Sequence, residues 1–386
     1  MNELLPLYDA TEMRALDAAA IDLGIPAAVL MERAGLGAAH EVMSRFPDCR
    51  RFSIVAGTGN NGGDGFVVGR HLLAAGLEPA VLLTGPATRL SPESRANLEA
   101  AERLGVPVHR RPSQAQLRRT LRGAEVVIDA LFGTGFRGAP RPAAATLIES
   151  INAAGRPVVA LDIPSGVDAS DGTVAGAAVE AVLTVAFHGP KLGLIVAPGS
   201  RHAGAVVVAD IGIPPQLESP TWSALATRSL IDLVPRKHHG TTKYRAGSLL
   251  VVGGSEGMAG APLLAARAAL RAGAGVAWVA VPAPVAAQVG ATQPELMVRA
   301  LPGGLELADR AGALAVGPGL GRSGEAQGMV RRLSRHRLPP RPRKRSHLHQ
   351  LHRIPLAGKQ HRPRPTVSRQ KSGSWPRRPP PPQLER

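Results

Sequence analysis

The chain has a single cysteine, few aromatic residues and no long apolar run, and each shortage excludes a class of protein. Because Cys49 stands alone among 386 residues, an intramolecular disulfide framework is impossible, which suits a reducing compartment. No run of about 18 apolar residues occurs, so we expect no membrane span. Glu3, Asp9 and Glu12 precede any apolar segment, which argues against a secretory signal peptide. These absences together predict a cytoplasmic protein.

Acidic residues are also scarce, but only towards the C-terminus. Residues 331–386 hold 17 of the 46 Lys and Arg but only one of the 29 acidic residues, Glu385. The first 330 residues then hold 29 basic and 28 acidic residues, so the net charge of +17 belongs almost wholly to the C-terminal end. The high charge is therefore no reason to expect a nucleic-acid-binding face on the folded part.

Composition changes abruptly near residue 334. From Ser334 to Arg386, Pro- and Arg-rich runs replace periodic patterns, with little apolar content to offset the entropy of ordering. We expect residues 334–386 to form a basic, disordered tail. The change falls inside an apparent α/β unit, which favours a reading-frame change over a genuine tail. Nucleic-acid binding by this tail is a further alternative, disfavoured because Trp375 is its only aromatic residue.

Most of the chain alternates short apolar runs with helix-like stretches. Residues 10–45 have the apolar spacing of one or two helices, broken at Pro26. The alternation that follows predicts an α/β fold with a mostly parallel, doubly wound sheet of the Rossmann-like, three-layer kind, and ligands at the carboxyl ends of its strands. The strand-like runs are 52–56, 79–83, 125–131, 157–162, 182–187 and 204–212, and the helix-like stretches are 66–75, 91–104 and 142–153.

A second α/β unit follows a linker. Its strand-like runs start near Gly247, at Val276 and at Ala313, and an Ala-rich helix is expected from Pro262 to Arg271. We therefore divide the chain into four parts: a first domain of residues 1–215, a linker of residues 216–236, a second domain of residues 237–333 and the tail of residues 334–386.

The run GTGNNGGDG at residues 57–65 joins a strand-like segment to a helix-like one. Glycines let a backbone approach a ligand, and a helix N-terminus offers unpaired N–H groups to an anion. Asn60, Asn61 and Asp64 make this run more polar than a pyrophosphate turn requires. The next strand also ends without an acidic residue for a ribose, which argues against an ordinary NAD(P) dehydrogenase. A turn shaped only by Gly and Asn is the alternative.

Further polar side chains stand at or just after predicted strands: Asp129, Asp162 and Lys191. In a doubly wound sheet these positions share one crevice with Asp64. Carboxylates there can transfer protons or bind a cation, and a nearby Lys can orient them. Each residue alone also has a structural alternative, as a helix cap, a turn residue or a surface lysine.

Four motifs together resemble the NAD(P)HX epimerase family over residues 1–215: GTGNNGGDG (57–65), DALFGTGFRG (129–138), LDIPSGVD (161–168) and FHGPKLG (187–193). This resemblance implies epimerisation of R- to S-NAD(P)HX at C6 of the hydrated nicotinamide, with hydrated NADH or NADPH as substrate. It also implies that Asp162 lies against the substrate and that a potassium ion (K+) is held by Asn61, Asp129 and Ser165. Because epimerisation needs proton transfer, we expect Asp162 to be the principal catalytic acid–base residue and Lys191 to be a partner that orients it or stabilises charge. The implied substrate contacts are Asn60, Asn61, Gly62, Gly63, Asp64, Gly133, Thr134, Gly135, Phe136, Arg137, Gly138, Ala139 and Asp162.

The second domain resembles the ADP- or ATP-dependent NAD(P)HX dehydratase family, which has a ribokinase-like fold. The resemblance depends on VVGGSEGMAGAP (251–262) and AVGPGLGRSG (315–324), and it implies ADP or ATP with Mg2+ as cofactors and Ala261 and Gly319 near the hydrated nucleotide. It stops near Arg332, and no Asp follows Asp309. Because phosphoryl transfer needs a base, we expect this truncated domain to lack dehydratase activity.

A rival interpretation of the first domain is a non-catalytic scaffold that keeps the nucleotide pocket. The presence of all four polar side chains, Asp64, Asp129, Asp162 and Lys191, argues against it. Members of the epimerase family often pair through this domain, so a homo-oligomer is a further implication of the resemblance. No nucleic-acid or membrane partner is expected.

Overall fold

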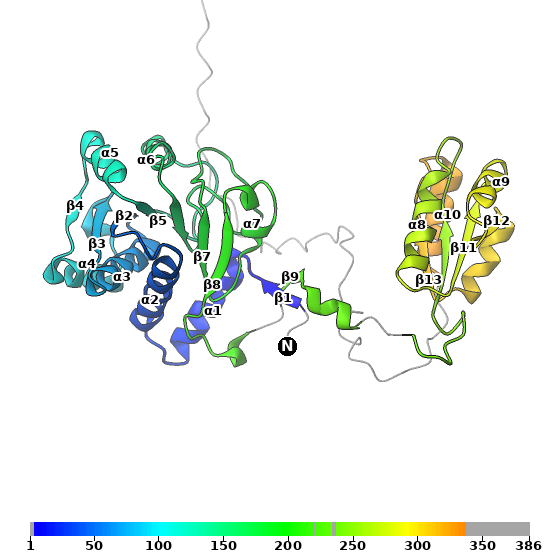
Figure 1. Cartoon of the computed structure of the whole chain (residues 1–386), viewed down its shortest axis with the longest axis horizontal. Coiled ribbons are helices and arrows are strands. Elements are labelled where there is room, and N and C mark those ends of the chain that lie inside the picture. The colour runs from blue at the N-terminus through cyan, green and yellow to red at the C-terminus, as the bar shows by residue number, and fades with distance from the viewer. Residues whose placement is uncertain (1–3, 219–220, 234–236, 337–386) are drawn as a thin grey trace, which may run out of the picture. The chain divides into compact units, whose positions relative to one another are not determined.

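The computed structural model describes residues 4–218, 221–233 and 237–336. The chain divides into two units, Met1–Asp232 and Leu233–Arg386 (Figure 1). Most of the predicted tail, from residue 337 onwards, lies outside the described residues. In the described ranges, no helix is long and apolar enough to cross a membrane.

A seven-stranded parallel sheet organises the first unit, in the order β4-β3-β2-β5-β6-β7-β8. The chain winds outwards from β2 in one direction and from β5 in the other, which makes the β2–β5 neighbourhood the topological switch point. The predicted doubly wound α/β fold is confirmed. The strands are β2 (Arg51–Ala56), β3 (Glu78–Leu83), β4 (Val108–Arg110), β5 (Val126–Ala130), β6 (Val158–Leu161), β7 (Leu183–Phe187) and β8 (Ala205–Ala209).

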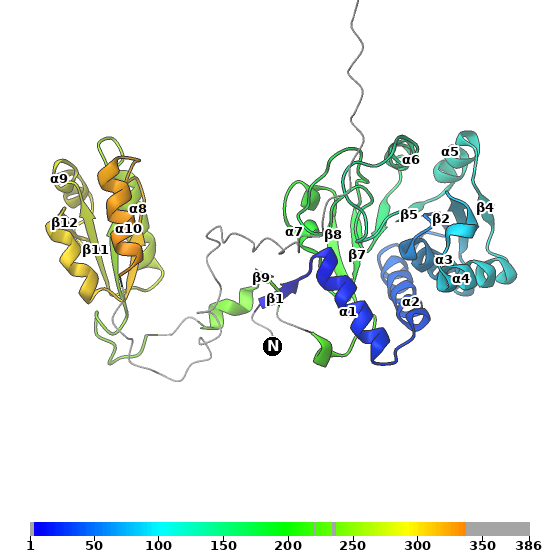
Figure 2. The same cartoon turned by 180° about the vertical axis from the view of Figure 1, so that it is seen from behind.

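Helices cover both faces of this sheet (Figures 1 and 2). One face packs on α1 to α4 through a core that includes Leu30, Phe66 and Leu98. The other packs on α5 and α6 through Leu117 and Ile148. The helices are α1 (Ala10–Asp22), α2 (Ala27–Arg45), α3 (Asn60–Ala74), α4 (Pro92–Leu104), α5 (Gln114–Gly123), α6 (Pro142–Asn152) and the short α7 (Leu192–Ile195).

The start of α3 corrects one prediction. The expected helix at 66–75 begins instead at Asn60, with Gly59 as its N-cap, so most of the glycine-rich run is helical. Packing explains the difference. A side chain at Gly62 would meet the Gly57 carbonyl oxygen, and one at Gly65 would lie 2.7 Å from the Ala130 methyl carbon. The glycines therefore let α3 start tight against the sheet, so their low helix propensity is outweighed.

Replacing Gly62 by alanine is expected to lower the free energy of unfolding by about 2–3 kcal/mol, because the new methyl group would meet backbone that cannot rotate away. Gly59→Ala is the matched control, since nothing lies within 4 Å of its added carbon and its φ of −86° suits any residue. Urea unfolding of both variants checks this. Equal stability of the two would contradict the packing account.

An antiparallel pair of strands corrects the expected linker. β9 (Ser223–Ala226) pairs with β1 (Leu4–Leu7), so part of residues 216–236 is tied to the N-terminal segment of the first unit. After β1, the backbone N–H of Tyr8 donates to Pro190 O, and Tyr8 O accepts from Leu192 N, at 3.0 and 2.9 Å. The N-terminal segment therefore holds the backbone on both sides of Lys191.

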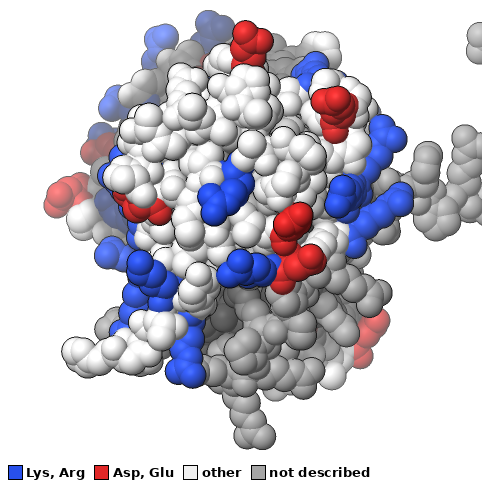
Figure 3. Space-filling model, turned by 90° about the vertical axis from the view of Figure 1, so that its right-hand side faces the viewer, with Lys and Arg blue, Asp and Glu red and all other residues white. Residues whose placement is uncertain are grey.

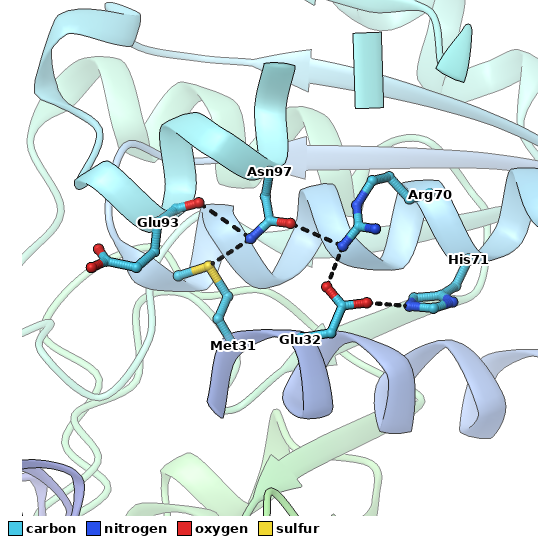
Figure 4. Close-up of polar contacts among 6 residues, drawn as sticks. All are labelled: Met31, Glu32, Arg70, His71, Glu93 and Asn97. Atoms are coloured by element: carbon cyan, nitrogen blue, oxygen red, sulfur yellow. Dashed lines mark hydrogen bonds and ion pairs between the residues drawn. The ribbon is translucent and has the colours of Figure 1, made fainter. Parts of the chain in front are cut away.

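A polar network joins α2, α3 and α4 (Figure 4). Arg70 forms an ion pair with Glu32 and donates to Asn97 Oδ1 at 2.9 Å, and His71 Nε2 lies 2.8 Å from the other Glu32 oxygen. Asn97 Nδ2 in turn lies 3.4 Å from Met31 Sδ. Partial burial raises the pKa of Glu32, but hydrogen bonds from His71 and Arg70 outweigh it and hold this pKa below its ordinary value.

Glu32→Gln is expected to cost about 1 kcal/mol of stability at pH 7, a modest value because Glu32 is partly exposed. Since its pKa is lowered in the folded state, this contribution is present above the ordinary pKa of a glutamate and is lost as the pH falls through the lowered value. Glu41→Gln, which breaks an exposed pair with Arg45, is the control and should change little. Thermal unfolding at pH 7 and pH 3.5 checks the prediction; equal losses at both would contradict it.

The second unit contains a four-stranded parallel sheet in the order β12-β11-β10-β13. Helices α8 and α9 pack on one face through Ala266 and Val285, and the other face packs on residues that include Ala308 and Leu333. The view in Figure 3 shows Lys and Arg side chains interspersed with Asp and Glu on one face of the molecule. The elements are β10 (Ser248–Val252), α8 (Gly260–Arg271), β11 (Val276–Val281), α9 (Ala283–Thr292), β12 (Met297–Ala300), β13 (Ala313–Val316) and α10 (Gly324–Ser334).

Candidate active site

A cavity of about 740 Å³ opens at the carboxyl ends of β2 and β5, the switch point of the first sheet. Its wall combines the start of α3, the loop after β5, the residue after β6 and one side of α1 and α2. Of the predicted substrate contacts, those that line it are Asn60, Asn61, Asp64, Gly133, Thr134, Gly135, Phe136, Arg137, Ala139 and Asp162.

Three predicted contacts do not line the cavity: Gly62, Gly63 and Gly138. Gly62 and Gly63 turn towards neighbouring elements, where a side chain on Gly63 would lie 2.6 Å from the Met31 methyl carbon. Gly138 has a φ of +73° in the loop after β5. All three are explained by backbone packing or conformation.

Asp162 and Lys191 form an ion pair beside the cavity. Lys191 is fully buried, and its ammonium also donates to Phe187 O at 2.7 Å. Asp162, 8% exposed, lines the cavity and accepts weak backbone hydrogen bonds from Thr134 and Phe187 at 3.4 Å each. Lys191 itself is not part of the cavity wall. The lysine therefore lies behind the carboxylate as seen from the cavity. From there it can orient Asp162 and offset its negative charge.

The backbone at Asp162 is unusual. Its φ of +65° falls in the left-handed region, which non-glycine residues seldom adopt, although Asp does so more readily than most. The turn is fixed by two hydrogen bonds, Asp162 N to Val185 O at 2.8 Å and Ile163 N to Leu161 O at 2.7 Å. This conformation turns the chain directly after β6 and presents the Asp162 carboxylate at the cavity wall.

The three predicted cation ligands lie together. Ser165 Oγ donates to Asp129 Oδ1 at 2.7 Å, and Ser165 N donates to Asp129 Oδ2 at 2.8 Å. Phe132 links the set, because its N–H donates to Ser165 Oγ and its carbonyl accepts from Asn61 Nδ2, both at 2.8 Å. Asp129 belongs to β5 itself rather than to the loop that follows.

Asn61, Asp129 and Ser165 offer oxygen atoms that a bound cation would stabilise. Asn61 Oδ1 is buried without a hydrogen-bond partner among the described residues. Asp129 is completely buried, and burial raises its pKa to about 6 despite donors from Ser165 and Leu131. The donor atoms are all oxygens, and no group of three His, Cys, Asp or Glu suited to a metal occurs in the described part of the chain. The residues therefore fit a monovalent cation better than zinc.

Asp17, a half-buried carboxylate on α1 that lines the same cavity, was not predicted from the sequence. Burial, followed by the charge of Asp162, raises its pKa to about 6, while Lys191 acts in the opposite direction. Burial and the charges of Asp162 and Asp17 also raise the pKa of Asp64 well above its usual range. Among the described residues, neither Asp17 nor Asp64 has a hydrogen-bond or ion-pair partner for its carboxylate.

In the second unit the structure brings together the two predicted residues. A side chain on Gly319 would lie 3.2 Å from the Ala261 methyl carbon, and the φ of +67° at Gly319 favours glycine. Ser255 Oγ donates to Gly319 O at 2.8 Å, which fixes the turn after β13 against the turn after β10. The positions meet at the carboxyl ends of neighbouring strands, where ligands bind in open parallel sheets.

Two family models match this chain. The model described as YjeF-related protein N-terminus matches residues 27–193, and the model described as NAD(P)H-hydrate dehydratase matches residues 249–339. The yeast protein ynu0, a solved structure, aligns with a TM-score of 0.48 at 23% identity, over 53% of this chain and 87% of its own.

Curated relatives match both units. A protein of Pyrobaculum aerophilum, named bifunctional NAD(P)H-hydrate repair enzyme Nnr, is 40% identical over 343 residues, which cover 84% of this chain. The chain spans only 66% of that relative's length. A Coxiella burnetii protein of the same name is 34% identical over 86% of this chain and 68% of its own length, and an NAD(P)H-hydrate epimerase of Limosilactobacillus fermentum is 41% identical over 52% of this chain and 94% of its own. The chain belongs to the family of bifunctional NAD(P)H-hydrate repair enzymes.

Proposed function

We propose that the first unit epimerises R-NADHX and R-NADPHX to the S forms at C6 of the hydrated nicotinamide ring. The observation that carries the proposal is the Asp162 carboxylate, ion-paired with buried Lys191 and presented to a cavity at the switch point of a doubly wound sheet. In support, a relative named NAD(P)H-hydrate epimerase is similar to 52% of this chain, and the family model described as YjeF-related protein N-terminus matches residues 27–193 of the first unit. Inverting C6 requires a bond to that carbon to break and re-form, which requires proton transfer, and a positioned carboxylate supplies it.

The cavity wall also suits the rest of a dinucleotide. Arg14, Arg137 and Arg141 line it and can meet the pyrophosphate. The backbone of Gly133 to Gly135 approaches the cavity without side chains on either glycine. The stacked rings of Phe132 and Phe136, 5.0 Å apart, form an apolar part of the wall. Each feature is consistent with a substrate that has a flat ring at one end and negative charge in the middle.

We propose that Asn61, Asp129 and Ser165 hold a potassium ion next to this site. When bound, the ion supplies a fixed positive charge that offsets the buried Asp129 carboxylate and satisfies the Asn61 oxygen. These residues also hold the loop after β5, through the hydrogen bonds of Asn61 and Ser165 with Phe132, against the start of α3. The expected role is structural: it fixes the two segments that line the cavity.

Potassium chloride is expected to raise the melting temperature of the full chain by several degrees over sodium or choline chloride at equal ionic strength, because an ion that binds only the folded state stabilises it. Asp129→Asn should abolish this difference, while the control Asp22→Asn, on the exposed end of α1, should keep it. Identical melting temperatures in all three salts would refute the cation site.

The epimerase proposal is tested by incubating the purified chain with R-NADHX and an excess of a separate S-specific dehydratase. The proposal predicts rapid NADH formation that depends on both proteins and saturates with substrate. No acceleration over spontaneous epimerisation, from a chain that is folded by circular dichroism, would contradict it.

We also propose that the second unit of this 386-residue chain does not dehydrate S-NADHX. Its only acidic residues beyond Asp309 are Glu325 and Glu385, and no Asp is present there to serve as the base for phosphoryl transfer. The same assay without the coupling enzyme, but with ADP or ATP and Mg2+, tests this. NADH formed from S-NADHX under those conditions would contradict it.

A further inference from the structure

Asp17 is the one carboxylate of the cavity wall that comes from α1, and no motif predicts it. Asp17 lies on α1 close to Met13 and Leu16, which are buried. The packing of these two residues directs this part of the helix to the cavity. The same cavity wall carries Asn61, Asp64 and Asp162, polar side chains of the proposed substrate site. Asp17 therefore faces the proposed substrate cavity rather than open solvent.

Asp17 and Asp162 stand in opposite electrostatic settings. Asp162 has the Lys191 ammonium as its direct partner, whereas Asp17 has no ion-pair partner among the described residues and lies near the like charge of Asp162. Two carboxyl groups whose surroundings differ in this way divide into a proton donor and a proton acceptor. The charged or titratable groups that line the cavity or act on Asp17 are Arg14 on its own helix, Asp64, Glu93, Arg137, Arg141, Asp162 and Lys191.

We propose that Asp17 is the general acid of the epimerisation and Asp162 the general base. This inference rests on the proposed epimerase function. In the ring-opening step, Asp162 takes the proton of the C6 hydroxyl as the C6–N1 bond breaks. The electron pair of that bond goes to N1, which receives the proton of Asp17, and C6 becomes an aldehyde.

Closure reverses these transfers after rotation about the C5–C6 bond. N1 attacks the other face of the aldehyde and returns its proton to Asp17, while the oxygen takes back the proton held by Asp162. No electron is gained or lost overall, no water is consumed, and both side chains regain their starting protonation. A single acid and a single base are therefore sufficient for inversion.

The pH profile of the reaction follows from this assignment. The folded-state pKa of Asp17 is about 6, raised by burial and by Asp162, so the donor form is present below that value and is lost as the pH rises through it. The wild-type kcat is therefore expected to fall about tenfold per pH unit on the alkaline side of the pKa that Asp17 has in the substrate complex.

The experiment measures kcat and KM for R-NADHX from pH 5 to pH 9, with melting temperatures, for the wild-type chain, Asp17→Asn, Asp64→Asn and Asp22→Asn. Asp22 ends the same helix and is exposed, which makes it the matched control. For Asp17→Asn we expect kcat to fall by about 100-fold or more, KM to change by less than about threefold, and the alkaline fall of kcat to vanish. Its melting temperature should stay equal or rise, because a like charge next to Asp162 is removed.

Three outcomes would overturn the inference. The first is an Asp17→Asn variant with kcat within about threefold of wild type. The second is a joint fall of kcat and melting temperature in that variant, which would make Asp17 a structural residue. The third is an alkaline fall of kcat that survives in Asp17→Asn but vanishes in Asp64→Asn, which would make Asp64 the acid. A wild-type chain that fails to epimerise at any pH would instead refute the proposed function itself.

Discussion

Asp162→Asn is expected to lower kcat for R-to-S conversion by about 10³-fold, because the variant loses the proton acceptor at the reacting carbon. The amide keeps the size of the carboxylate, but its single oxygen can accept only one of the two weak hydrogen bonds from Thr134 and Phe187, which donate to different oxygens of Asp162. The substrate cavity should therefore persist, and KM should change far less than kcat. Epimer separation by chromatography after fixed incubation times measures the rate directly.

A control is needed because Asp162→Asn also removes the partner of a fully buried ammonium. The double variant Asp162→Asn/Lys191→Met carries neither charge and is expected to fold more stably than the single variant, yet to remain inactive. Recovery of activity together with stability in the double variant would contradict the catalytic role of Asp162.

Lys191→Met is expected to lower the free energy of unfolding by about 3–5 kcal/mol, the cost of leaving a buried charge without its partner. Lys191 is 0% exposed and Asp162 is 8% exposed, so water cannot easily take the place of the ammonium. The variant also leaves Phe187 O without the 2.7 Å hydrogen bond that Lys191 supplies. Urea denaturation of the wild type, both single variants and the double variant gives the coupling energy between the two sites.

The exposed pair of Glu41 and Arg45 supplies the comparison for that cycle. These side chains form an ion pair of 3.4 Å on the surface of α2, where removal of one partner should cost less than about 0.5 kcal/mol. A Glu41→Gln/Arg45→Met cycle with a coupling energy as large as that of Asp162 and Lys191 would show that burial is not what makes the internal pair strong.

Local sequence patterns predicted the sheet of the first unit well, because parallel strands buried on both faces are short, continuous apolar runs. The runs at 52–56 and 182–187 agree with β2 and β7 within a residue or two. The predicted start of α3 was wrong for a tertiary reason: three glycines in its first two turns oppose a helix locally, but close packing against neighbouring segments favours one.

Asp17 was not predicted because the residues next to it in the sequence form no functional motif. The apolar spacing of α1 indicates only an amphipathic helix, and a charged residue on such a helix is ordinarily solvated. Its place at the cavity wall depends on how α1 packs into the core of the first unit through Met13 and Leu16, which residues far apart in the sequence decide. The same holds for Tyr8, whose backbone pairing with Pro190 and Leu192 fixes Lys191, a residue 183 positions later in the chain.

The positions of the motif residues were easier to predict, because each is set by the strand that directly precedes or contains it. Asp129, Asp162 and Ser165 stand at or just after buried strands, and the switch point brings these positions together whatever the details of packing. The roles of individual glycines were harder to predict from the sequence, because one glycine can line the cavity while its neighbour packs against another segment. Asn61 and Gly62 are neighbours in the chain, yet only Asn61 lines the cavity.

The epimerase activity of the first unit is tested by the initial rate of R-to-S NADHX conversion by the wild-type chain, with the folded Asp162→Asn/Lys191→Met double variant as the blank. We expect saturable acceleration by the wild type and only the spontaneous rate with the double variant. Equal, spontaneous rates from both proteins, when both bind NADHX, would contradict it and would make the first unit a nucleotide-binding scaffold instead of an enzyme.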